Sequence, residues 1–439
     1  MRKVLWTALF FALCAALVFG EGSGALKSGA LNAGNTEQTA KKRGDYLTIK
    51  LAVIGVGDEF YTWWGHLGVI VKNELTGQTL LYDYGVFSFS AEHFLGNLIA
   101  GNWYYSMMAR DADDDIDWYI KTNRDIVFYT LNLSAAQKEK MLDFLNWNSL
   151  PENRRYYYKI FTDNCVTRVV YLLDDVLDGR FLARYRDEPG RLTVRHHANR
   201  HLYRSPVLYW ILNFVMGQDI DTPPNKFAEM FLPEEFGKYT ADFSYTDESG
   251  ALVPLVTNVE VVNTSAGRKL PLPDEPAAGI PAAISGVLLA LFFGFIYLRW
   301  TQGGEFAGKR RGARALLGIT QALWGFFLGI FGTLLFYAEF FSNHIYTYNN
   351  INVVFINPLL LAALPLGLIF AFTKKQKTML ACKTALKILW TYVLLGALLT
   401  IVVKISPSFF QVNFLTLLVV MPPALVLSFM PNKKIRMAG

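Results

Sequence analysis

The sequence predicts an α+β extracytoplasmic domain followed by an all-α transmembrane bundle of about five helices. Two observations predict this architecture. The 439 residues are 52% apolar and 15% aromatic, which is unusual for a soluble enzyme. From Gly279 onward the chain consists mostly of long apolar runs, whereas the preceding part combines β-rich runs with helical patterns.

The apolar runs of the C-terminal part are each about 20 residues long, which is enough for a helix to span a bilayer. Their centres hold no ionisable residue, which argues against proton or ion transport as the function. The predicted transmembrane region is therefore 279–439, with spans at 279–298, 315–337, 351–373, 385–403 and 410–430.

The N-terminus has the pattern of a targeting segment. A basic start, an apolar stretch and small residues near Gly20 predict a signal peptide or an N-terminal anchor over residues 1–20. Residues 21–44 are rich in Gly, Ala, Ser and Lys, and we expect them to form a flexible leader.

Positive charge between the apolar runs predicts the orientation in the membrane. The loops containing "GKRRGAR" and "KKQKTMLACK" and the tail "NKKIRMAG" are basic, whereas "SNHIYTYNN" and "SPSFFQ" carry no Lys or Arg. Basic loops remain in the cytoplasm. We therefore expect a multi-pass protein of the cytoplasmic (inner) membrane with a cytoplasmic C-terminus and with the part before Gly279 outside, which agrees with the signal-like start.

The net charge of +6 does not indicate a nucleic-acid partner. Residues 280–439 hold 14 Lys and Arg against two acidic residues, which leaves 28 against 34 in the rest of the chain. The basic excess therefore follows the membrane topology, and nucleic-acid binding is not predicted.

The extracytoplasmic domain is predicted over residues 45–262. Its strands are "YLTIKLAVIGV", a hairpin "HLGVIVKNELTGQTLLYDYG" that turns at Thr76-Gly77, and "DIVFYTLNL". A helix capped by Ser134 follows in "SAAQKEKMLDFLNWN". After the strand-like "VEVVN", residues 263–278 form a Pro-rich stretch that we expect to be a stiff tether to the first span.

Cysteine usage singles out Cys165. Cys14, Cys165 and Cys382 are expected in separate compartments, so no disulfide framework is predicted. Apolar residues after Cys165 follow helical spacing, with Asp163 or Asn164 as the N-cap. A thiol in the first helical turn meets free N–H groups and the positive end of the helix dipole, which favour a thiolate and can hold an oxyanion. The other interpretation is an inert, buried cysteine.

A thiolate nucleophile needs a base, and His66 is the best candidate because it opens a predicted strand directly after Gly65. Asp83, on the neighbouring strand of the hairpin, could orient the ring, and Tyr84 is its rival. His66 could also be a structural strand histidine.

Three further histidines have the spacing of a helical metal pair, but we predict no metal site there. His196, His197 and His201 lack the Glu of a zinc-protease motif and lie in an Arg-rich stretch. No cofactor motif is present in the sequence.

The order of "GHLGVIV" before "DNCVTRV" resembles the extracytoplasmic N-terminal domain of Lnb-type lipoprotein N-acyltransferases. Supporting stretches are "YDYGVFSF", "YYYKIFTDNCVTR" and "MGQDIDTPPNKFAEMFLP", and the resemblance covers roughly residues 50 to 245. It implies a circularly permuted, papain-like (NlpC-like) domain. Related permuted acyltransferases often use a second histidine as the orienting group, where this chain offers Asp83.

The resemblance implies an enzyme that moves an acyl chain from the glyceryl moiety of a bacterial lipoprotein to its N-terminal α-amino group. His66 would deprotonate Cys165, and a Cys165 thioester would form with its oxyanion held near Asn164. Arg168, one turn after Cys165, could contact a carboxylate or phosphate or merely solvate the helix. The expected partners are the membrane and diacylglyceryl lipoproteins or another membrane lipid.

The same residues leave two other functions open. A membrane-tethered papain-like cell-wall peptidase or amidase would use the same residues, with water intercepting the acyl-enzyme. A non-catalytic membrane assembly protein would place Cys165 far from every histidine. The separation of Cys165 and His66 distinguishes this last possibility from the enzymes.

Overall fold

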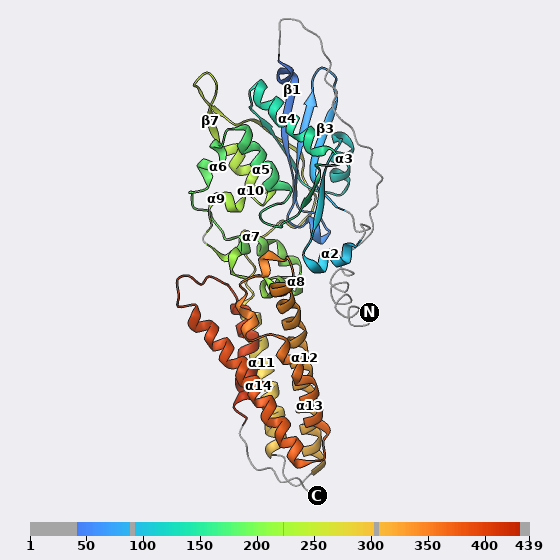
Figure 1. Ribbon diagram of the computed structural model, residues 1–439, viewed down its shortest axis with the longest axis vertical. Coiled ribbons are helices and arrows are strands. Elements are labelled where there is room, and N and C mark those ends of the chain that lie inside the picture. Colours follow the sequence, from blue (N-terminus) through green and yellow to red (C-terminus); the bar gives the residue numbers. More distant parts are fainter. Residues whose placement is uncertain (1–41, 88–92, 223, 303–306, 431–439) are drawn as a thin grey trace. The chain divides into compact units, whose positions relative to one another are not determined.

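The computed structural model describes residues 42–87, 93–222, 224–302 and 307–430 (Figure 1). The chain forms two compact units. The domain unit contains the described residues up to Arg204 together with 224–275, and the helical unit contains 205–222 and the residues from Pro276 onward. The chain therefore passes between the units three times.

This division differs from the predicted one at two places. Residues 205–222, which the sequence assigned to the extracytoplasmic domain, belong to the helical unit. Most of the predicted tether is hydrogen-bonded to the domain unit, where the Leu272 N–H donates to the Arg200 carbonyl at 3.1 Å and the Asn199 side chain donates to Glu275 at 2.9 Å. The unit boundary falls at Glu275, near the end of the Pro-rich stretch.

A seven-stranded antiparallel sheet forms the centre of the domain unit. The predicted hairpin is present as β2 (His66–Asn73) and β3 (Thr79–Val86), with Gly77 in the left-handed conformation at φ +73° that favours glycine. A two-stranded sheet of β7 (Ser244–Thr246) and β8 (Leu252–Pro254) lies apart from it. The large sheet has the order β6 (Arg155–Tyr157), β4 (Tyr104–Asp111), β3 (Thr79–Val86), β2 (His66–Asn73), β1 (Leu47–Ile54), β5 (Ile126–Leu131) and β9 (Val256–Asn263).

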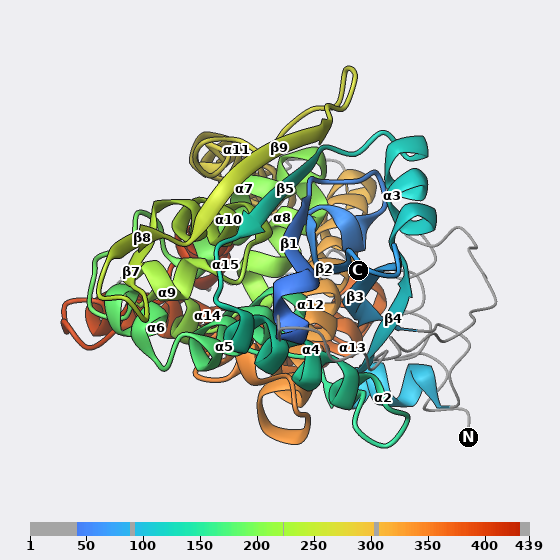
Figure 2. The same cartoon turned by 90° about the horizontal axis from the view of Figure 1, so that it is seen from above.

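Helices cover both faces of this sheet (Figure 2). The domain unit has two hydrophobic cores. The larger lies under α4 (Ala135–Ser149) and α5 (Cys165–Val176), and the smaller lies under α3 (Ala112–Lys121). The Ser134 side chain accepts from the N–H of Gln137, whose side chain bonds back to Ser134, so the predicted cap of α4 is confirmed as a capping box. The helices of the domain unit are α2 (Phe94–Ala100), α3 (Ala112–Lys121), α4 (Ala135–Ser149), α5 (Cys165–Val176), α6 (Arg180–Tyr185), α7 (Val194–His201), α9 (Lys226–Glu229) and α10 (Pro233–Asp242).

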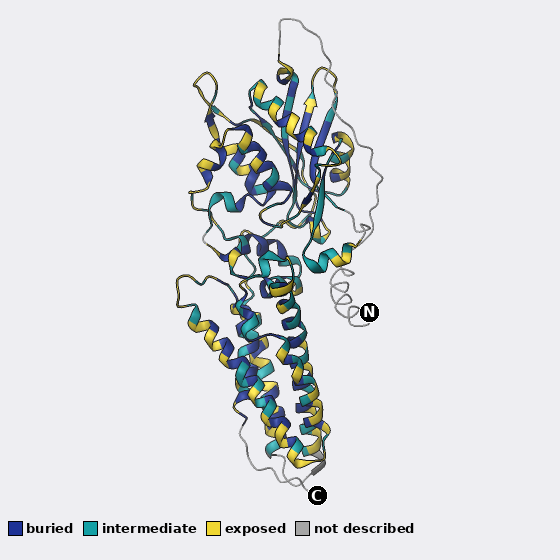
Figure 3. Cartoon of the chain, viewed as in Figure 1, coloured by how far each residue is buried: buried dark blue, intermediate teal, exposed yellow. Residues whose placement is uncertain are grey.

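Strand alternation decides which residues meet which helices. On β2, Leu67 and Val69 are fully buried in the larger core with α5. Ile70, at an even position, belongs to the smaller core with Tyr119 of α3. Buried residues are gathered on the strands and on the sides of the helices that face them (Figure 3).

Among its described residues, the helical unit contains four helical segments long and apolar enough to cross a membrane, namely 279–301, 310–341, 351–372 and 376–403. The fifth predicted span is a shorter helix of 15 residues with Pro422 and Pro423 inside it. The main helices are α11 (Gly279–Gln302), α12 (Ala307–Phe341), α13 (Ala363–Phe372), α14 (Gln376–Val403) and α15 (Phe414–Ser428), and short turns η6 (Ile351–Val354) and η7 (Pro358–Ala362) precede α13.

The helix α8 (Pro206–Val215) explains why 205–222 belongs to the helical unit. Trp210 packs against Phe331 of α12 with ring centroids 5.3 Å apart. The Asn350 side chain donates to the Phe214 carbonyl at 2.9 Å, and the Gln411 side chain donates to the Met216 carbonyl at 3.2 Å. The last carbonyls of a helix have no N–H partner within that helix, and these side-chain amides supply one for α8. In an apolar environment such carbonyls need a partner from the protein.

Candidate active site

His66 begins β2 directly after a tight backbone turn. Gly65 has φ +77°, and a Cβ there would lie 2.8 Å from the Ile54 carbonyl oxygen, so both conformation and space favour glycine. The His66 side chain is 14% exposed. It belongs to the even positions of β2, on the sheet face covered by α3, where its ring centroid lies 6.2 Å from that of Tyr119.

Asp83 is the carboxylate partner of His66. The β2–β3 register pairs Asp83 with Gly68, two positions after His66, so the Asp83 and His66 side chains point to the same α3 face. The His66 Nε2 and Asp83 Oδ1 atoms are 2.9 Å apart, and Oδ1 also accepts the Gly85 N–H at 2.6 Å. The Asp83 side chain is only 6% exposed, so this ion pair is shielded from water.

Arg110 extends this pair into a network that sequence reasoning missed. Its Nη2 lies 2.6 Å from Asp83 Oδ2, and its Nε lies 2.7 Å from Oδ2 of Asp115 on α3. The β3–β4 register pairs Leu81 with Arg110, which brings Arg110 to the same face as Asp83. The sequence signals only which face of β4 Arg110 occupies, through the alternation of side chains along the strand. It does not reveal that Arg110 meets Asp83.

Gly85 leaves room for the His66 ring. A Cβ at this position would lie 2.5 Å from His66 Cε1 and 3.2 Å from His66 Nδ1. The ring therefore packs directly over the Gly85 backbone, whose N–H also holds Asp83. Any side chain at residue 85 would have to displace the imidazole.

The network shifts the pKa values of both partners. Burial alone would lower the pKa of His66, but the neighbouring acidic groups Tyr119, Asp83 and Cys165 raise it, and the pKa lies well above its ordinary value. Burial opposes ionisation of Asp83, yet the positive charges of His66 and Arg110 and the Gly85 hydrogen bond lower its pKa to about 2. At neutral pH the Asp83 carboxylate is therefore charged.

Cys165 is the first residue of α5 and is 8% exposed. Of the two predicted N-cap residues, Asp163 and Asn164, it is Asn164 that caps the helix. Its Oδ1 accepts the N–H groups of Val166 and Thr167 at 2.9 Å each. Its Nδ2 donates to the carbonyls of Ile160 and Phe231.

This N-cap reduces the number of N–H groups that are available to hold an oxyanion beside Cys165. The N–H groups of the second and third helical residues are already bonded to Asn164, and both amide hydrogens of its side chain are in use. The backbone N–H of Cys165 has no hydrogen-bond partner within the described part of the chain. It is the first-turn donor that remains for a developing negative charge.

Cys165 and His66 lie at one end of the sheet but belong to different faces. Cys165 is part of the larger core, whereas His66 and Asp83 face α3. The segment from Phe231 to Pro233 links them, because the Phe231 carbonyl accepts from Asn164 and a Cβ at Gly65 would lie 3.4 Å from Pro233.

The thiol and the ring interact electrostatically. A negative charge on Cys165 contributes to the raised pKa of His66, although less than Tyr119 and Asp83 do. The Cys165 and His66 side chains are both in the described part of the chain, and they are not hydrogen-bonded to each other. Catalytic hydrogen bonds often form only when substrate is bound.

The other two predicted support residues have different surroundings. Tyr84 points into the larger core, where its hydroxyl donates to Asn148 Oδ1 at 2.9 Å, so it lies on the opposite face from Asp83. Arg168 contacts a carboxylate of the protein itself: its Nε and Nη2 donate to Asp163 at 2.7 and 3.1 Å. Its guanidinium carbon also lies 3.7 Å from the ring centroid of Tyr156.

Aromatic rings belong to or pack against the core that contains Cys165. Tyr105 stacks on Tyr158 at 4.0 Å and on Phe87 at 4.9 Å. Burial and the charge of Cys165 raise the pKa of Tyr105. The core that contains Cys165 is therefore rich in aromatic rings.

The three clustered histidines have structural partners. His197 Nε2 lies 2.9 Å from Glu229 Oε1, and that oxygen also accepts two backbone N–H groups. His201 Nδ1 contacts the His197 carbonyl at 2.7 Å, and His196 Nε2 lies 3.4 Å from Glu275 Oε1. Burial and the positive charge of Arg200 lower the pKa of His201 to about 3, so its ring is neutral.

Comparison with known proteins gives one match. Residues 35–200 match the family described as the Lnb N-terminal periplasmic domain. The match covers less than half of the 439-residue chain and includes His66, Asp83, Arg110 and Cys165. No curated protein and no solved structure matches the chain.

Proposed function

We propose that this membrane protein, whose residues 35–200 match the Lnb N-terminal periplasmic domain family, is a cysteine-dependent lipoprotein N-acyltransferase. It would move an acyl chain from the glyceryl moiety of a lipoprotein to the α-amino group of the lipoprotein's N-terminal cysteine. The observation that carries this proposal is the buried His66–Asp83–Arg110 network at the end of the sheet where α5 presents Cys165.

In the first half-reaction, His66 accepts the proton of the Cys165 thiol. The thiolate attacks the glyceryl ester carbonyl, and the Cys165 N–H donates to the oxyanion. The tetrahedral intermediate collapses to a thioester, and the glyceryl oxygen leaves with the proton that His66 returns to it. Because Cys165 and His66 face different sides of the sheet end, substrate binding must bring the thiol toward the ring.

In the second half-reaction, the lipoprotein's α-amino group attacks the thioester. His66 takes a proton from the nitrogen, an amide bond forms, and the Cys165 sulfur leaves and recovers the proton. The products are an N-acylated lipoprotein with one free glyceryl hydroxyl and the restored enzyme.

Asp83 and Arg110 would act through His66. Asp83 holds one ring nitrogen and stabilises the protonated imidazole. Arg110 and the Gly85 N–H hold the two carboxylate oxygens, so the ring keeps one orientation.

The apolar helices support a lipid substrate. Four helical segments are long enough to cross a bilayer, and the ester bond of a lipoprotein lies at the bilayer surface. In this proposal the domain is periplasmic and the basic tail is cytoplasmic, in agreement with the basic loops.

Mass spectrometry of lipoprotein N-terminal peptides tests the proposal. Cells that lack their own N-acyltransferase would express the full chain, Cys165→Ala or Cys382→Ala. The last variant is a matched control, because Cys382 is also a free, buried cysteine but lies in α14. We expect wild type and Cys382→Ala to add an acyl group to the α-amino nitrogen and Cys165→Ala to add none. Unmodified peptides with all three inserted proteins would overturn the assignment.

A cell-wall peptidase or amidase is the second candidate, and a cavity beside α5 favours it. The cavity has a volume of about 510 Å³ and a mixed polar lining that includes Lys159, Asp163, Arg168 and Tyr171. A cavity with charged and apolar side chains next to the thiol-bearing helix suits a peptide better than an acyl chain. Cys165-dependent release of fragments from purified peptidoglycan, without lipoprotein acylation, would favour this function.

A further inference from the structure

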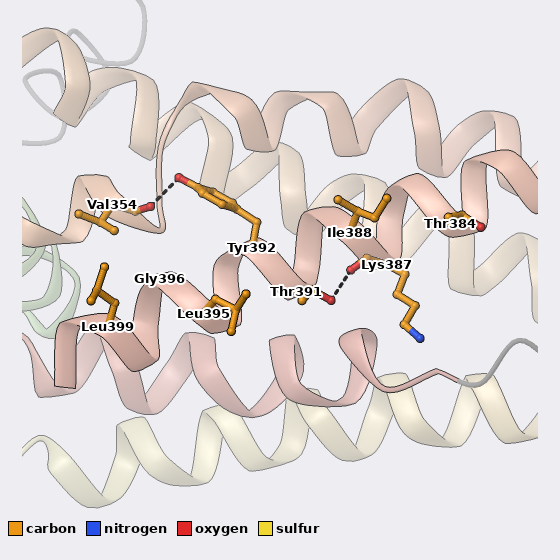
Figure 4. A pocket seen from close by; sticks show the side chains of 9 residues that line it. All are labelled: Val354, Thr384, Lys387, Ile388, Thr391, Tyr392, Leu395, Gly396 and Leu399. Carbon is orange, nitrogen blue, oxygen red and sulfur yellow. Dashed lines mark hydrogen bonds between the residues drawn. The ribbon is translucent and has the colours of Figure 1, made fainter. Parts of the chain in front are cut away.

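An apolar groove runs along α14 in the helical unit. Its volume is about 520 Å³, and its lining is almost entirely apolar. Figure 4 shows the lining side chains along the helix, with Thr384 and Lys387 at one end and Leu399 with Val354 at the other. Ile388 and Leu395 are 65% and 60% exposed, which is expected for side chains that face lipid.

The polar atoms along the middle of the groove are satisfied by the protein. The Tyr392 hydroxyl donates to the Val354 carbonyl at 2.5 Å, and Thr391 donates to the Lys387 carbonyl at 2.8 Å. In the part of the chain that the structure describes, the Lys387 ammonium has no hydrogen-bond or ion-pair partner. The groove therefore combines an apolar trough with one uncompensated cation at its end.

The dimensions and charge fit an amphiphile. From Lys387 to Leu399 a helix rises about 18 Å, at 1.5 Å per residue. This is long enough for most of an extended acyl chain. Lys374, Lys375 and Lys377 lie at the same end of α14 in sequence, so the surroundings of the headgroup end are positive.

We propose that this groove binds an anionic glycerophospholipid of the membrane, with an acyl chain along Ile388–Leu399 and the phosphate at Lys387. The site lies in the helical unit, contains no residue of the proposed acyl-transfer machinery and would hold a bound lipid rather than a substrate. Its occupation would be independent of Cys165.

Native mass spectrometry of the delipidated full chain in detergent tests the site. The protein would be titrated with phosphatidylglycerol and, separately, with phosphatidylcholine. We expect wild type to prefer phosphatidylglycerol, and Lys387→Ala to bind it about fivefold more weakly, since one interfacial cation is removed. Lys387→Arg should keep the preference, and Lys121→Ala, an exposed cation on α3 of the domain unit, should change binding much less.

A second readout locates the acyl chain. Phosphatidylglycerol with a diazirine in the acyl chain should label residues 388–399 on irradiation, and Leu395→Trp, which fills the groove, should reduce that labelling. Equal binding of both lipids by wild type, or labelling unaffected by Lys387→Ala and Leu395→Trp, would overturn the proposal. Cys165→Ala should bind lipid like wild type, so the failure of the acyl-transfer proposal is distinguishable from the failure of this one.

Discussion

At the scale of single residues, the charge of Asp83 controls the proposed base. Replacing Asp83 by Asn removes a negative charge that raises the pKa of His66, so that pKa falls. We expect the acidic limb of the pH profile of kcat/KM to shift to lower pH and kcat to fall by about 10²–10⁴-fold. Acyl transfer measured between pH 5 and 9 checks this. The exposed Asp117→Asn on α3 is the control, and an unchanged acidic limb in Asp83→Asn would contradict the assignment of His66 as the base.

A second prediction at this scale concerns Arg110, because its positive charge compensates the buried carboxylate of Asp83. Arg110→Gln leaves Asp83 with one cationic partner fewer, and we expect the free energy of unfolding to fall by about 3–5 kcal/mol near neutral pH. The exposed Arg155→Gln should change it little. Unfolding of the full chain in detergent, followed by intrinsic fluorescence, measures both variants.

The two shifted pKa values also define a pH window for this stabilisation. The pKa of Asp83 is lowered to about 2, so its contribution is complete above the unfolded value and is lost as pH falls toward 2. The pKa of His66 is raised, so its contribution is complete below the unfolded value near 6.5 and is lost as pH rises through the folded value. The stability difference between wild type and Asp83→Asn should therefore be largest between about pH 4 and 6.5, and a difference that grew steadily above pH 7 would contradict the pairing.

Gly85→Ala tests the position of the ring. The added Cβ would approach His66 Cε1 to 2.5 Å, so the imidazole must move, and we expect kcat/KM to fall by about 10–100-fold in a folded protein. Gly96→Ala is the matched control, because a Cβ there meets no atom within 4 Å. Equal activity of the two variants would show that the ring position does not matter.

At the scale of secondary-structure elements, a comparison of two helix caps distinguishes effects on stability from effects on activity. Ser134 caps α4 away from the site, and Asn164 caps α5 beside Cys165. We expect Ser134→Ala to lower the free energy of unfolding by about 1 kcal/mol without changing kcat. Asn164→Ala should cost about 1–3 kcal/mol and also reduce kcat, because it frees the first turn that carries the thiol. Loss of activity in both variants to the same degree would mean that stability alone controls the assay.

At the scale of the whole molecule, whether α15 crosses the membrane decides on which side the C-terminus lies. It has 15 residues and rises only about 22 Å, less than the roughly 30 Å of a bilayer core, yet the basic tail after it favours the cytoplasm. We expect Ala438→Cys, in a cysteine-free background, to react with an impermeant maleimide only after permeabilisation. Leu75→Cys, in the turn between β2 and β3, should react in intact spheroplasts. Labelling of both in intact spheroplasts would mean that α15 does not cross.

The sequence by itself determined the features that depend on near neighbours. The apolar runs, the β2–β3 hairpin, the cap of α4 and the position of Cys165 at the start of α5 are written in residues a few positions apart. Composition and local periodicity report such features directly.

Only the tertiary structure decided the rest. Strand register selected Asp83 over Tyr84 as the neighbour of His66 and brought Arg110 across from β4. Packing assigned residues 205–222 to the helical unit, because buried amides from distant segments satisfy the end of α8. A register shift of one residue reverses which face a side chain occupies, and the energy that sets the register comes from contacts between strands, which local patterns do not contain.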